Sequence, residues 1–474
     1  MNAIGLMALL ASALMFCTIQ ESTLPDGTTN LPETEIATPE ENYAEYCASC
    51  HGADARAFAD RNTWVHGSDK ASIHRVIVEG LVNDGMPAFE VTFTEEEVEA
   101  LSQYIVDAKL YVDQYAFVES FDDSQVFTYG THQYRLEMVT DQVDIPWGMA
   151  RAHNGDHYYT DRSGALRMLD DQGTVVDISG LPEIKAIGQG GLMDVLLAKD
   201  YETTKRIYFT YSKPNPANAD EVTTAVHTGI VTDGEITQGE DIWIAKPYYP
   251  TRYHFGSRMI WDNDGYLYVS IGDRGKRDVN PQDLSLHPGK IHRIHADGSI
   301  PEDNPFVGQS GVVSSIYSYG HRNPQGLAYD AQRNIIYENE HGPRGGDEIN
   351  IIRPEVNYGW PVISYGINYS GTTFTELTEA PGMEQPIHYW VPAIGVCGLA
   401  YVSSDLYPDW QGHLLSGSLK YEYLNLNRVG SDANDEERLF PKVGRLRSVI
   451  QGADDYIYIG VEDPGRIYRI VPVY

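Results

Sequence analysis

Six segments of the chain share one pattern, in which a polar turn is followed by alternating apolar and aromatic residues. This period of two places successive side chains on opposite faces of a β-strand. The first, third and last segments are followed by similar partner strands that begin at Gly164, Gly289 and Gly465. A strand pattern that recurs with irregular spacing is typical of a radial β-architecture, so six copies predict an all-β, six-bladed β-propeller over residues 131–474. The segments occupy residues 154–162, 204–212, 264–273, 333–342, 412–420 and 454–463, and the copy at 412–420 matches weakly.

The pattern before residue 113 is helical instead. Thr38 precedes Pro39 and two glutamates, which is the composition of a capped helix start. A second helix is predicted after Thr94, because three glutamates follow this cap and Val98, Leu101, Tyr104 and Ile105 recur at helical spacing. The N-terminal part is therefore expected to form a small all-α domain.

The segment CASCH lies between these two helices. Cys47 and Cys50 have the spacing that bonds the vinyl groups of a c-type haem, and His51 follows as the axial ligand of the iron. Half of a zinc site is the alternative, but the chain has no second CxxC to complete four ligands. Met86, in the segment NDGMPAF, is the expected second iron ligand, and a core methionine is the alternative there. These features predict a cytochrome c domain over residues 39–112, with a linker at 113–130.

The first 38 residues indicate export. Residues 3–16 form an apolar run too short to span a bilayer, and a signal peptide is expected over residues 1–20. No Lys or Arg precedes Arg56, and Cys17 resembles a lipoprotein acceptor except that the bulky Phe16 precedes it. Residues 21–38 are rich in Thr, Pro and Glu and read as a disordered linker. Because haem is attached to CxxCH outside the bacterial cytoplasm, we expect a periplasmic or otherwise exported protein, bound to a membrane only if Cys17 is lipidated.

Charge narrows the possible partners. The 474 residues include 34 Lys and Arg against 68 Asp and Glu, a formal net charge of −34. Such a chain repels phosphate backbones and anionic membranes, so nucleic acid is not an expected partner. A basic soluble electron carrier would fit this surface, although solubility alone also explains it.

Polar residues concentrate in the predicted loops of the propeller. Residues 318–361 contain His321, Arg322 and Asn323 next to a proline, and a short strand that breaks at Gly342 and Pro343. Loops at strand ends are where a rigid β-scaffold commonly carries its chemistry. His254, in the segment YHFGSR, has the pKa range of a general base, but an isolated histidine is more often structural than catalytic.

Several long segments together resemble the soluble quinoprotein aldose and glucose dehydrogenases, the glucose/sorbosone dehydrogenase family. The resemblance covers about residues 145–474 and rests on GQGGLMDV, RYHFGSRMIWDNDGYLYVSIGDRG, LHPGKIHRIHADGSIPEDNPF, YGHRNPQGLAYD, EHGPRGGDEINII, NYGWPVISYG and APGMEQPIHYW. It implies a six-bladed propeller that binds pyrroloquinoline quinone (PQQ) and calcium over its central channel.

The resemblance also implies roles for single residues. His254 would be the base, and Arg322 would be a cation near the quinone oxygen. Calcium beside PQQ would be held by the carbonyls of Gly342 and Pro343. The implied cofactor-binding residues are Gln189, Arg322, Asn323, Lys420, Arg445 and Arg447, and a second, structural calcium would lie at Glu348 and Tyr358. The chain departs from the family at residues 393–397, where it has AIGVC in place of a serine-containing segment, which leaves Cys397 as a free thiol near the cofactor.

The expected function is that of a quinohaemoprotein sugar dehydrogenase. It would oxidise the C1 hydroxyl of an aldose to a lactone, with hydride transfer to PQQ and one-electron transfers to the c-type haem. A soluble cytochrome or a respiratory chain would be the downstream electron acceptor. Two alternatives stay open: a non-catalytic ligand-binding propeller with the haem as a redox sensor, and a calcium-dependent lactone hydrolase.

Overall fold

The computed structural model describes residues 37–51, 55, 58, 64, 66–82, 85–110, 125–430, 435–462 and 464–474, without the side chains of Ser49, Cys50 and Leu110. The expected signal peptide, Cys17, the linker over residues 21–36, residues 113–124 and the Cys50 thiol lie outside this description. The predicted helical domain and the propeller belong to one compact unit, Thr38–Tyr474.

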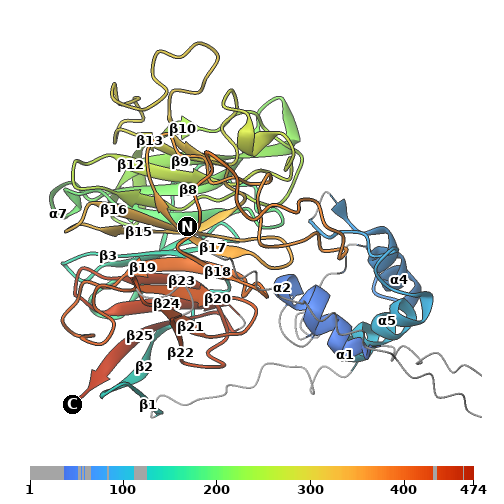
Figure 1. The fold of residues 1–474 in the computed structure, drawn as a ribbon. Coiled ribbons are helices and arrows are strands. Elements are labelled where there is room, and N and C mark those ends of the chain that lie inside the picture. The colour runs from blue at the N-terminus through green and yellow to red at the C-terminus, as the bar shows by residue number, and fades with distance from the viewer. Residues whose placement is uncertain are drawn as a thin grey trace, which may run out of the picture. The chain divides into compact units, whose positions relative to one another are not determined.

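The two predicted helix starts are present. Thr38 forms a capping box with Glu41, and the Thr94 hydroxyl accepts a hydrogen bond from Glu97 N (3.3 Å) while the Glu97 carboxylate accepts one from Thr94 N (2.8 Å). The helix α4, which begins after the capping residue Asp69, was not predicted from the sequence. The described helices before the propeller are α1 (Pro39–Asn42), the π-helix η1 (Tyr43–Cys47), α2 (Ala48–His51), α4 (Lys70–Glu79) and α5 (Glu95–Leu110) (Figure 1). The propeller contains α7 (Tyr201–Thr204) and the 3₁₀-helix η3 (Asn280–Gln282).

A small apolar core joins these helices. Val98, Leu101 and Ile105 of α5 are buried, as the helical spacing predicts, and they pack in one cluster with Ile73 and Ile77 of α4. Among the described residues, no helix is long and apolar enough to cross a membrane.

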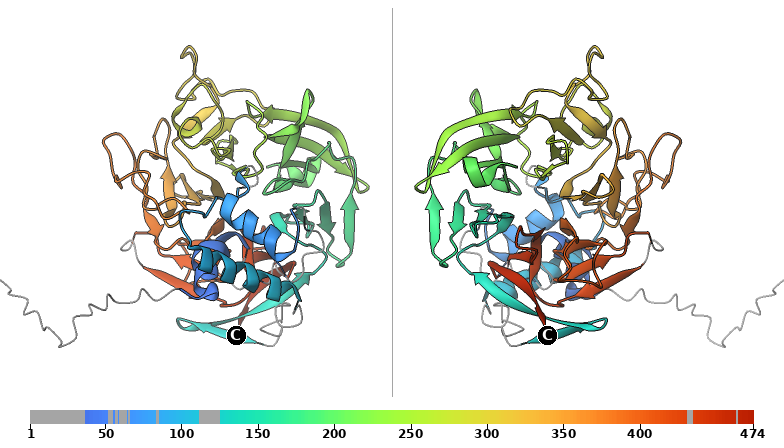
Figure 2. Two further views of the ribbon diagram at one scale, coloured as in Figure 1. Left: turned by 90° about the vertical axis from the view of Figure 1, so that its right-hand side faces the viewer. Right: turned by 90° about the vertical axis from the view of Figure 1, so that its left-hand side faces the viewer.

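The described strands form six antiparallel sheets, which confirms the predicted propeller. Figure 2 shows the sheets arranged around a common axis. The first sheet contains β3 (Pro146–Arg151), β4 (His157–Asp161), β5 (Leu166–Leu169) and β6 (Val175–Ile178), and the second contains β7 (Leu192–Leu197), β8 (Arg206–Asn215), β9 (Asn218–Thr232) and β10 (Glu235–Ile244). The third contains β11 (Met259–Trp261), β12 (Leu267–Ile271), β13 (Lys290–Ile294) and β14 (Ile316–Tyr319), and the fourth contains β15 (Pro324–Asp330), β16 (Ile335–Glu340), β17 (Asp347–Ile352) and β18 (His388–Trp390).

The last two sheets complete the ring. The fifth contains β19 (Val396–Tyr401), β20 (Leu414–Ser418), β21 (Leu424–Asn427) and β22 (Glu436–Leu439). The sixth contains β23 (Arg445–Gln451), β24 (Ile457–Glu462) and β25 (Arg466–Val473), and it is completed by β2 (His132–Thr140) and β1 (Val126–Tyr129) from the start of the propeller. The pairing of β2 with β25 therefore fastens the two ends of the propeller to each other. Strand β1 lies inside the segment that the sequence predicted to be a linker.

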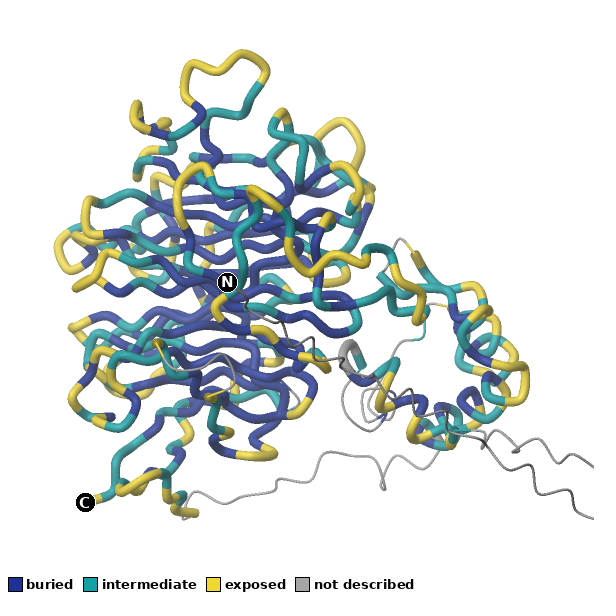
Figure 3. The backbone as a smooth tube through the Cα atoms, in the orientation of Figure 1, coloured by how far each residue is buried: buried dark blue, intermediate teal, exposed yellow. Residues whose placement is uncertain are grey.

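The six repeated segments correspond to the second strand of each sheet, β4, β8, β12, β16, β20 and β24. The first strands, β3, β7, β11, β15, β19 and β23, contact one another in sequence around the ring and surround the central channel. Buried residues follow the strands and exposed residues occupy the loop tips (Figure 3). Apolar and aromatic side chains fill the space between neighbouring sheets, as where Tyr134 stacks on Trp410 with ring centroids 4.4 Å apart.

Candidate active site

A cavity of about 1110 Å³ lies against the first-strand ends of the propeller. Most of the propeller residues that the sequence singled out line this cavity, namely Gln189, His254, Arg322, Asn323, Gly342, Pro343, Arg445 and Arg447. Lys420, Glu348 and Tyr358 are not among its lining residues. Convergence of polar side chains in one large concave site is the usual form of a ligand pocket.

His254 is held as a base would be held. It lies in the loop before β11, with a positive φ of 56°, and its Nδ1 is 2.7 Å from the Asp273 carboxylate. Asp273 also accepts a hydrogen bond from Trp360 Nε1 (2.9 Å), and Gln189 accepts one from His254 N (2.8 Å). With Nδ1–H donated to Asp273, the neutral imidazole has its lone pair on Nε2. His254 is therefore in the tautomer that can accept a proton.

The electrostatics around His254 favour its neutral form. Burial lowers its pKa from the usual 6.5, and Arg322 and Arg274 lower it further, while Asp273 opposes the shift. The pKa of Asp273 is itself below its ordinary value, since His254 and Arg322 outweigh the effect of burial. The pair thus consists of a neutral imidazole and a carboxylate at neutral pH.

Arg322 provides a buried positive charge on the same wall. Its Nη1 donates to the carbonyl of His341 (3.0 Å), and its guanidinium carbon lies 5.3 Å from the ring centroid of Trp360. Its backbone N–H donates to the Glu340 carboxylate. Within the described part of the chain, Arg322 Nε and His341 Nε2 are buried without a hydrogen-bond partner. Buried polar atoms of this kind normally have one, so these two point to a polar ligand in the cavity.

The side-chain amide oxygens of Asn323 and Gln189 already accept hydrogen bonds within the protein. Asn323 Oδ1 accepts from Gly256 N (3.2 Å) and from Gln325 Nε2 (3.3 Å), and Gln189 Oε1 accepts from His254 N. Their amide oxygens therefore position the site, and their NH2 groups are the ends suited to donate to a ligand.

A second polar group in the cavity contains three arginines and Glu462. Arg445 Nε and Arg447 Nη2 lie 3.0 and 3.1 Å from Glu462 Oε1. Burial disfavours the charges in this group, but the arginines outweigh it and lower the pKa of Glu462 to about 2. Arg162, which the sequence analysis did not identify, also lines the cavity. Three guanidinium groups around one carboxylate leave a net positive surface, which suits an anionic ligand.

Lys420 lies beside the cavity, whereas Ala393 and Gly395 of the departure at residues 393–397 line it. Lys420 Nζ is 5.1 Å from the ring centroid of Tyr421, and its backbone N–H donates to the Ile394 carbonyl (3.0 Å). Cys397 is fully buried in β19, with Sγ 3.5 Å from Arg447 Nη1. The thiol therefore lies behind a cavity arginine rather than on the cavity wall, and Lys420 binding to a cofactor stays a prediction.

The predicted calcium ligands of the cavity are backbone carbonyls in the loop between β16 and β17. Gly342 N donates to Asp347 Oδ1 (2.9 Å), and no described residue donates to the carbonyl oxygens of Gly342 and Pro343. Burial raises the pKa of Asp347 to about 6, although backbone amides that include Val396 N oppose the shift. Unpaired carbonyls beside a carboxylate form an oxygen-rich donor set, which fits a hard cation such as calcium.

Glu348 belongs to a second acidic group. His321, Glu338 and Glu340 offer ligand atoms that lie within 4.8 Å of one another, and Glu338 Oε1 has no hydrogen-bond partner among the described residues. Burial, and then the charge of Glu340, raise the pKa values of Glu338 and Glu348 well above the usual range. The Tyr358 ring stacks on His321 at 4.7 Å. Buried carboxylates without a cationic partner fit the predicted structural calcium at this position.

The N-terminal helices contribute Cys47, His51 and Met86 to the lining of the same cavity. Cys47 is half-buried, and the backbone of Met86 bridges to Leu81 in the loop after α4. The structure therefore brings together one predicted attachment cysteine and both predicted iron ligands, which fits a c-type haem.

Polar contacts join the N-terminal helical domain to the propeller loops. Arg344, in the loop between β16 and β17, forms an ion pair with Glu45, and its guanidinium carbon lies 4.2 Å from the Tyr46 ring centroid. Thr92 Oγ1 donates to the Ser370 carbonyl (3.0 Å). These contacts place the two predicted cofactor regions at one cavity.

Tyr253 lies between the two regions. Its ring is 4.8 Å from the His254 ring, centroid to centroid. On its other side it packs against Gly85, where an added Cβ would lie 3.1 Å from the ring of Tyr253. Because Gly85 directly precedes Met86, one aromatic side chain connects the loop of the predicted base with the loop of the predicted iron ligand.

Sequence patterns missed several cavity residues. These residues contact partners that are not close in sequence, so no local spacing reveals them. They are Asp273, Trp360, Arg162 and Glu462. The one available signal is that Glu462 ends β24 and Asp273 follows the end of β12, so both lie where a repeated second strand gives way to a loop.

Comparisons with known proteins agree with this geometry. Residues 143–469 match the family model "Glucose / Sorbosone dehydrogenase", and residues 34–105 match "Cytochrome C oxidase, cbb3-type, subunit III". The chain is 38% identical to the aldose sugar dehydrogenase YliI of Escherichia coli over 346 residues, which are 71% of this chain and 92% of that protein. It is 27% identical to quinoprotein glucose dehydrogenase B of Acinetobacter calcoaceticus over 275 residues, 53% of this chain and 57% of that protein.

A solved structure gives the same result. The crystal structure of the soluble aldose sugar dehydrogenase of Escherichia coli in its apo-form superposes with a TM-score of 0.67 at 36% identity, and the match covers 72% of this chain and 100% of that one. The family match extends over more than half of the chain and includes every propeller residue of the cavity discussed above. The protein therefore belongs to the glucose/sorbosone dehydrogenase family and has an N-terminal cytochrome c domain in addition to the family's propeller.

Proposed function

We propose that the protein is a PQQ-dependent aldose dehydrogenase that passes electrons from the propeller to its own c-type haem. The observation that carries the proposal is one cavity lined both by the His254, Asp273 and Arg322 group and by Cys47, His51 and Met86. The printed names of the relatives, an aldose sugar dehydrogenase and a quinoprotein glucose dehydrogenase, support sugar oxidation and a quinone cofactor.

The side chains of the cavity supply the proton chemistry. His254 accepts the proton of the sugar C1 hydroxyl at Nε2, and Asp273 holds the imidazole in the required tautomer and stabilises the imidazolium that forms. Arg322 keeps a positive charge on the same wall, where it stabilises negative charge that develops during the reaction. PQQ, when bound, supplies the acceptor for the hydride that leaves C1. The sugar product is a lactone.

The cavity also fits an anionic cofactor and its metal ion. Arg162, Arg445 and Arg447 are suited to carboxylate groups, and the arginine fork binds such groups with two parallel hydrogen bonds. The carbonyls of Gly342 and Pro343 are suited to hold calcium next to the cofactor, and Glu348 with its acidic neighbours is suited to hold a structural calcium. The NH2 groups of Gln189 and Asn323 complete the set of donors.

The cytochrome c domain gives the electrons a defined exit. His51 and Met86 would hold the iron of a haem attached at Cys47, and that haem would supply a one-electron acceptor. The domain is part of the same chain, so its effective concentration at the propeller is high. A sugar yields two electrons, so each turnover requires two transfers through the haem to a soluble cytochrome or a respiratory chain. Haem attachment and the N-terminal apolar run support an exported, periplasmic location, with a lipid anchor if Cys17 is modified.

Reconstitution of the full chain tests the proposal. Holo-cytochrome protein is loaded with PQQ and calcium, aldoses are added, and haem reduction is followed optically. We expect haem reduction, and two equivalents of a one-electron acceptor consumed for each lactone formed. If PQQ binds but no aldose reduces the haem, the electron-transfer function is wrong.

Two variants assign the chemistry. His254→Ala should abolish haem reduction while PQQ stays bound, and an unchanged rate would remove His254 as the base. Met86→Ala should leave sugar-dependent reduction of an artificial acceptor intact and alter the haem spectrum. Lactone hydrolysis without any redox change would instead favour the calcium-dependent hydrolase.

A further inference from the structure

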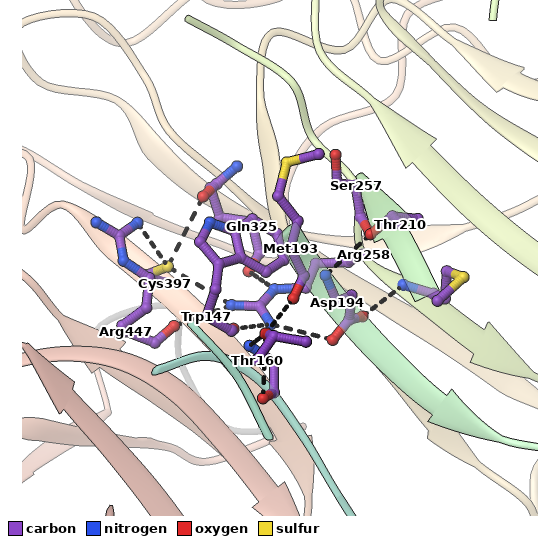
Figure 4. Close-up of polar contacts among 12 residues, drawn as sticks. Trp147, Thr160, Met193, Asp194, Thr210, Ser257, Arg258, Gln325, Cys397 and Arg447 are labelled. Atoms are coloured by element: carbon purple, nitrogen blue, oxygen red, sulfur yellow. Dashed lines mark hydrogen bonds and ion pairs between the residues drawn. The ribbon is translucent and has the colours of Figure 1, made fainter. Parts of the chain in front are cut away.

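Arg258 occupies an unusual position in the ring of sheets. It directly precedes β11 in the third sheet, and its side chain is buried. The guanidinium donates from Nε to the Gln325 carbonyl (2.7 Å), from Nη1 to the Trp147 carbonyl (2.8 Å) and from Nη2 to the Arg447 carbonyl (2.9 Å). Figure 4 shows the guanidinium surrounded by these partners.

The Arg258 guanidinium makes two further contacts, with the second and the fifth sheets. Nη1 lies 3.4 Å from Asp194 Oδ1, and Nη2 lies 3.8 Å from Cys397 Sγ. The partners of Arg258 therefore come from β3, β7, β15, β19 and β23, which are the first strands of all five other sheets. A group that contacts the innermost strand of every sheet must lie across the central channel.

The guanidinium also lies directly behind the cavity. Trp147, Gln325 and Arg447, whose carbonyls it binds, line the cavity, whereas Arg258 is not a lining residue. Its guanidinium carbon is 4.0 Å from the ring centroid of Trp147. Three walls of the cofactor region are thus attached at their main chains to one planar group.

Among the residues that the structure describes, the other polar links near the axis join neighbouring sheets. Thr160 Oγ1 donates to the Met193 carbonyl, and Thr210 Oγ1 donates to the Ser257 carbonyl (2.8 Å). Arg258 links sheets that are not neighbours, such as the third and the sixth. These links between neighbouring sheets therefore cannot replace Arg258 in fixing the distances between opposite walls of the cavity.

The shape of the side chain explains why arginine stands there. A guanidinium has five N–H donors in a rigid plane, so it can bind carbonyls that approach from different directions, while an ammonium group is a point charge on a flexible stem. Asp194 balances the buried charge, and its other oxygen accepts from Met259 N (2.8 Å), which anchors the strand that follows Arg258.

We propose that Arg258 is a positioning residue for the dehydrogenase reaction, which fixes the floor of the cofactor cavity by holding the main chains of Trp147, Gln325 and Arg447 at set distances. The inference rests on the proposed function, because the cofactor concerned is PQQ. Arg258 does not touch the cofactor, and it acts through the residues that do.

Arg258→Lys tests the inference in the full-length holo-cytochrome protein. PQQ affinity is measured by quenching of tryptophan fluorescence, since Trp147 and Trp360 line the cavity. We expect PQQ affinity to fall by roughly tenfold or more, because loss of a residue that orients the ligand-binding groups of a site typically costs at least that much affinity. In the PQQ-saturated variant, kcat should fall by more than KM for the sugar rises, because the cofactor is misplaced while the sugar contacts remain.

Arg293→Lys is the matched control. Arg293 is also buried, pairs with Asp303 and lies over the ring of Tyr266 at 4.3 Å, but it does not line the cavity. We expect a lower unfolding midpoint and an unchanged PQQ affinity. Loss of PQQ affinity in both variants in proportion to their loss of stability would show a merely structural role and overturn the inference.

The remaining outcomes are distinct. No PQQ binding by the native protein overturns the proposed function, and this inference with it. Native-like PQQ affinity and kcat in Arg258→Lys overturn only the inference. If Arg258→Lys does not fold, Asp194→Asn decides, because it keeps Arg258 and the local shape but weakens the anchor of the guanidinium. Weaker PQQ binding in Asp194→Asn supports the inference, and unchanged binding overturns it.

Discussion

At the scale of single residues, the site depends on charged groups that restrain one another. Asp273 holds His254 through Nδ1, and Trp360 holds Asp273, so the base has little freedom to rotate. Glu462 holds Arg445 and Arg447 in the same way. Such restraint places reactive groups before substrate arrives, which is the main contribution a protein makes to electrostatic stabilisation.

The first prediction concerns the pH dependence of sugar oxidation. His254 accepts a proton only when it is neutral, so activity is present above its pKa and is lost as pH falls through it. Burial and Arg322 lower this pKa from 6.5, so the acid limb of kcat/KM should lie below pH 6.5. Asp273 raises the pKa of His254, so Asp273→Asn should move the limb to still lower pH and reduce the rate by roughly 10²-fold or more, because the tautomer is no longer fixed.

A pH–rate profile of each variant checks this prediction. Trp360→Phe is the control, because it removes one hydrogen bond to Asp273 but keeps the carboxylate. Its acid limb should move less than that of Asp273→Asn. An acid limb above pH 6.5 in the native protein would contradict the role assigned to His254.

At the scale of elements, the sequence predicts a strand or helix best where residues within that element are enough to determine it. The second strand of every sheet was visible as a period of two, and α5 was visible from its cap, its first-turn glutamates and its apolar face. The helix α4 was missed although Asp69 caps it, and β1 was expected to be linker. Strand β1 forms because β2 is available to pair with it, which is a property of the ring and not of residues 126–129.

The second prediction concerns the start of α5. Thr94→Ala removes the hydroxyl that accepts from Glu97 N, and should lower the free energy of unfolding of the helical domain by about 1 kcal/mol. Thermal unfolding followed by helical circular dichroism measures the change. Thr94→Ser keeps the hydroxyl and should restore most of the stability. Equal losses in both variants would show that the methyl group of Thr94, not its hydroxyl, stabilises the helix start.

At the scale of the whole molecule, the propeller is closed by its two ends. Strand β2 pairs with β25 in the last sheet, so the residues that begin and end the propeller share one set of hydrogen bonds. The cavity forms only when this ring is complete, since residues that line it, such as Asp144 before β3 and Glu462 at the end of β24, lie 318 residues apart in sequence. Stability of the closed ring and binding of the cofactor are therefore linked.

The third prediction concerns acid stability of the closed ring. His157 in β4 packs edge-on to Tyr458 in β24, where the first and last sheets meet, with ring centroids 4.7 Å apart. Burial lowers its pKa to about 3. Between pH 6.5 and about 3 the unfolded chain binds a proton that the folded protein does not, so stability falls as pH falls, by up to about 1.4 kcal/mol per pH unit for this residue.

Urea unfolding at a series of pH values measures this slope. His157→Leu should reduce this slope by the contribution of about one proton, and the substitution His153→Leu at an exposed position should leave the slope unchanged. A slope that is identical in the native protein and His157→Leu would show that His157 is not buried in its neutral form.

The sequence by itself determined the features that depend on local period and local chemistry. These are the six repeated strands, the two capped helices, the CASCH segment and the family motifs that contain His254, Arg322 and Gly342. Only the tertiary structure decided which residues meet, because closure of the ring brings together groups with no fixed spacing along the chain. Asp273 beside His254, Glu462 between Arg445 and Arg447, and Arg258 across the channel are all consequences of that closure. A guanidinium that extends from one sheet and contacts the five others has no sequence pattern, since its partners are mostly backbone carbonyls, which every residue has.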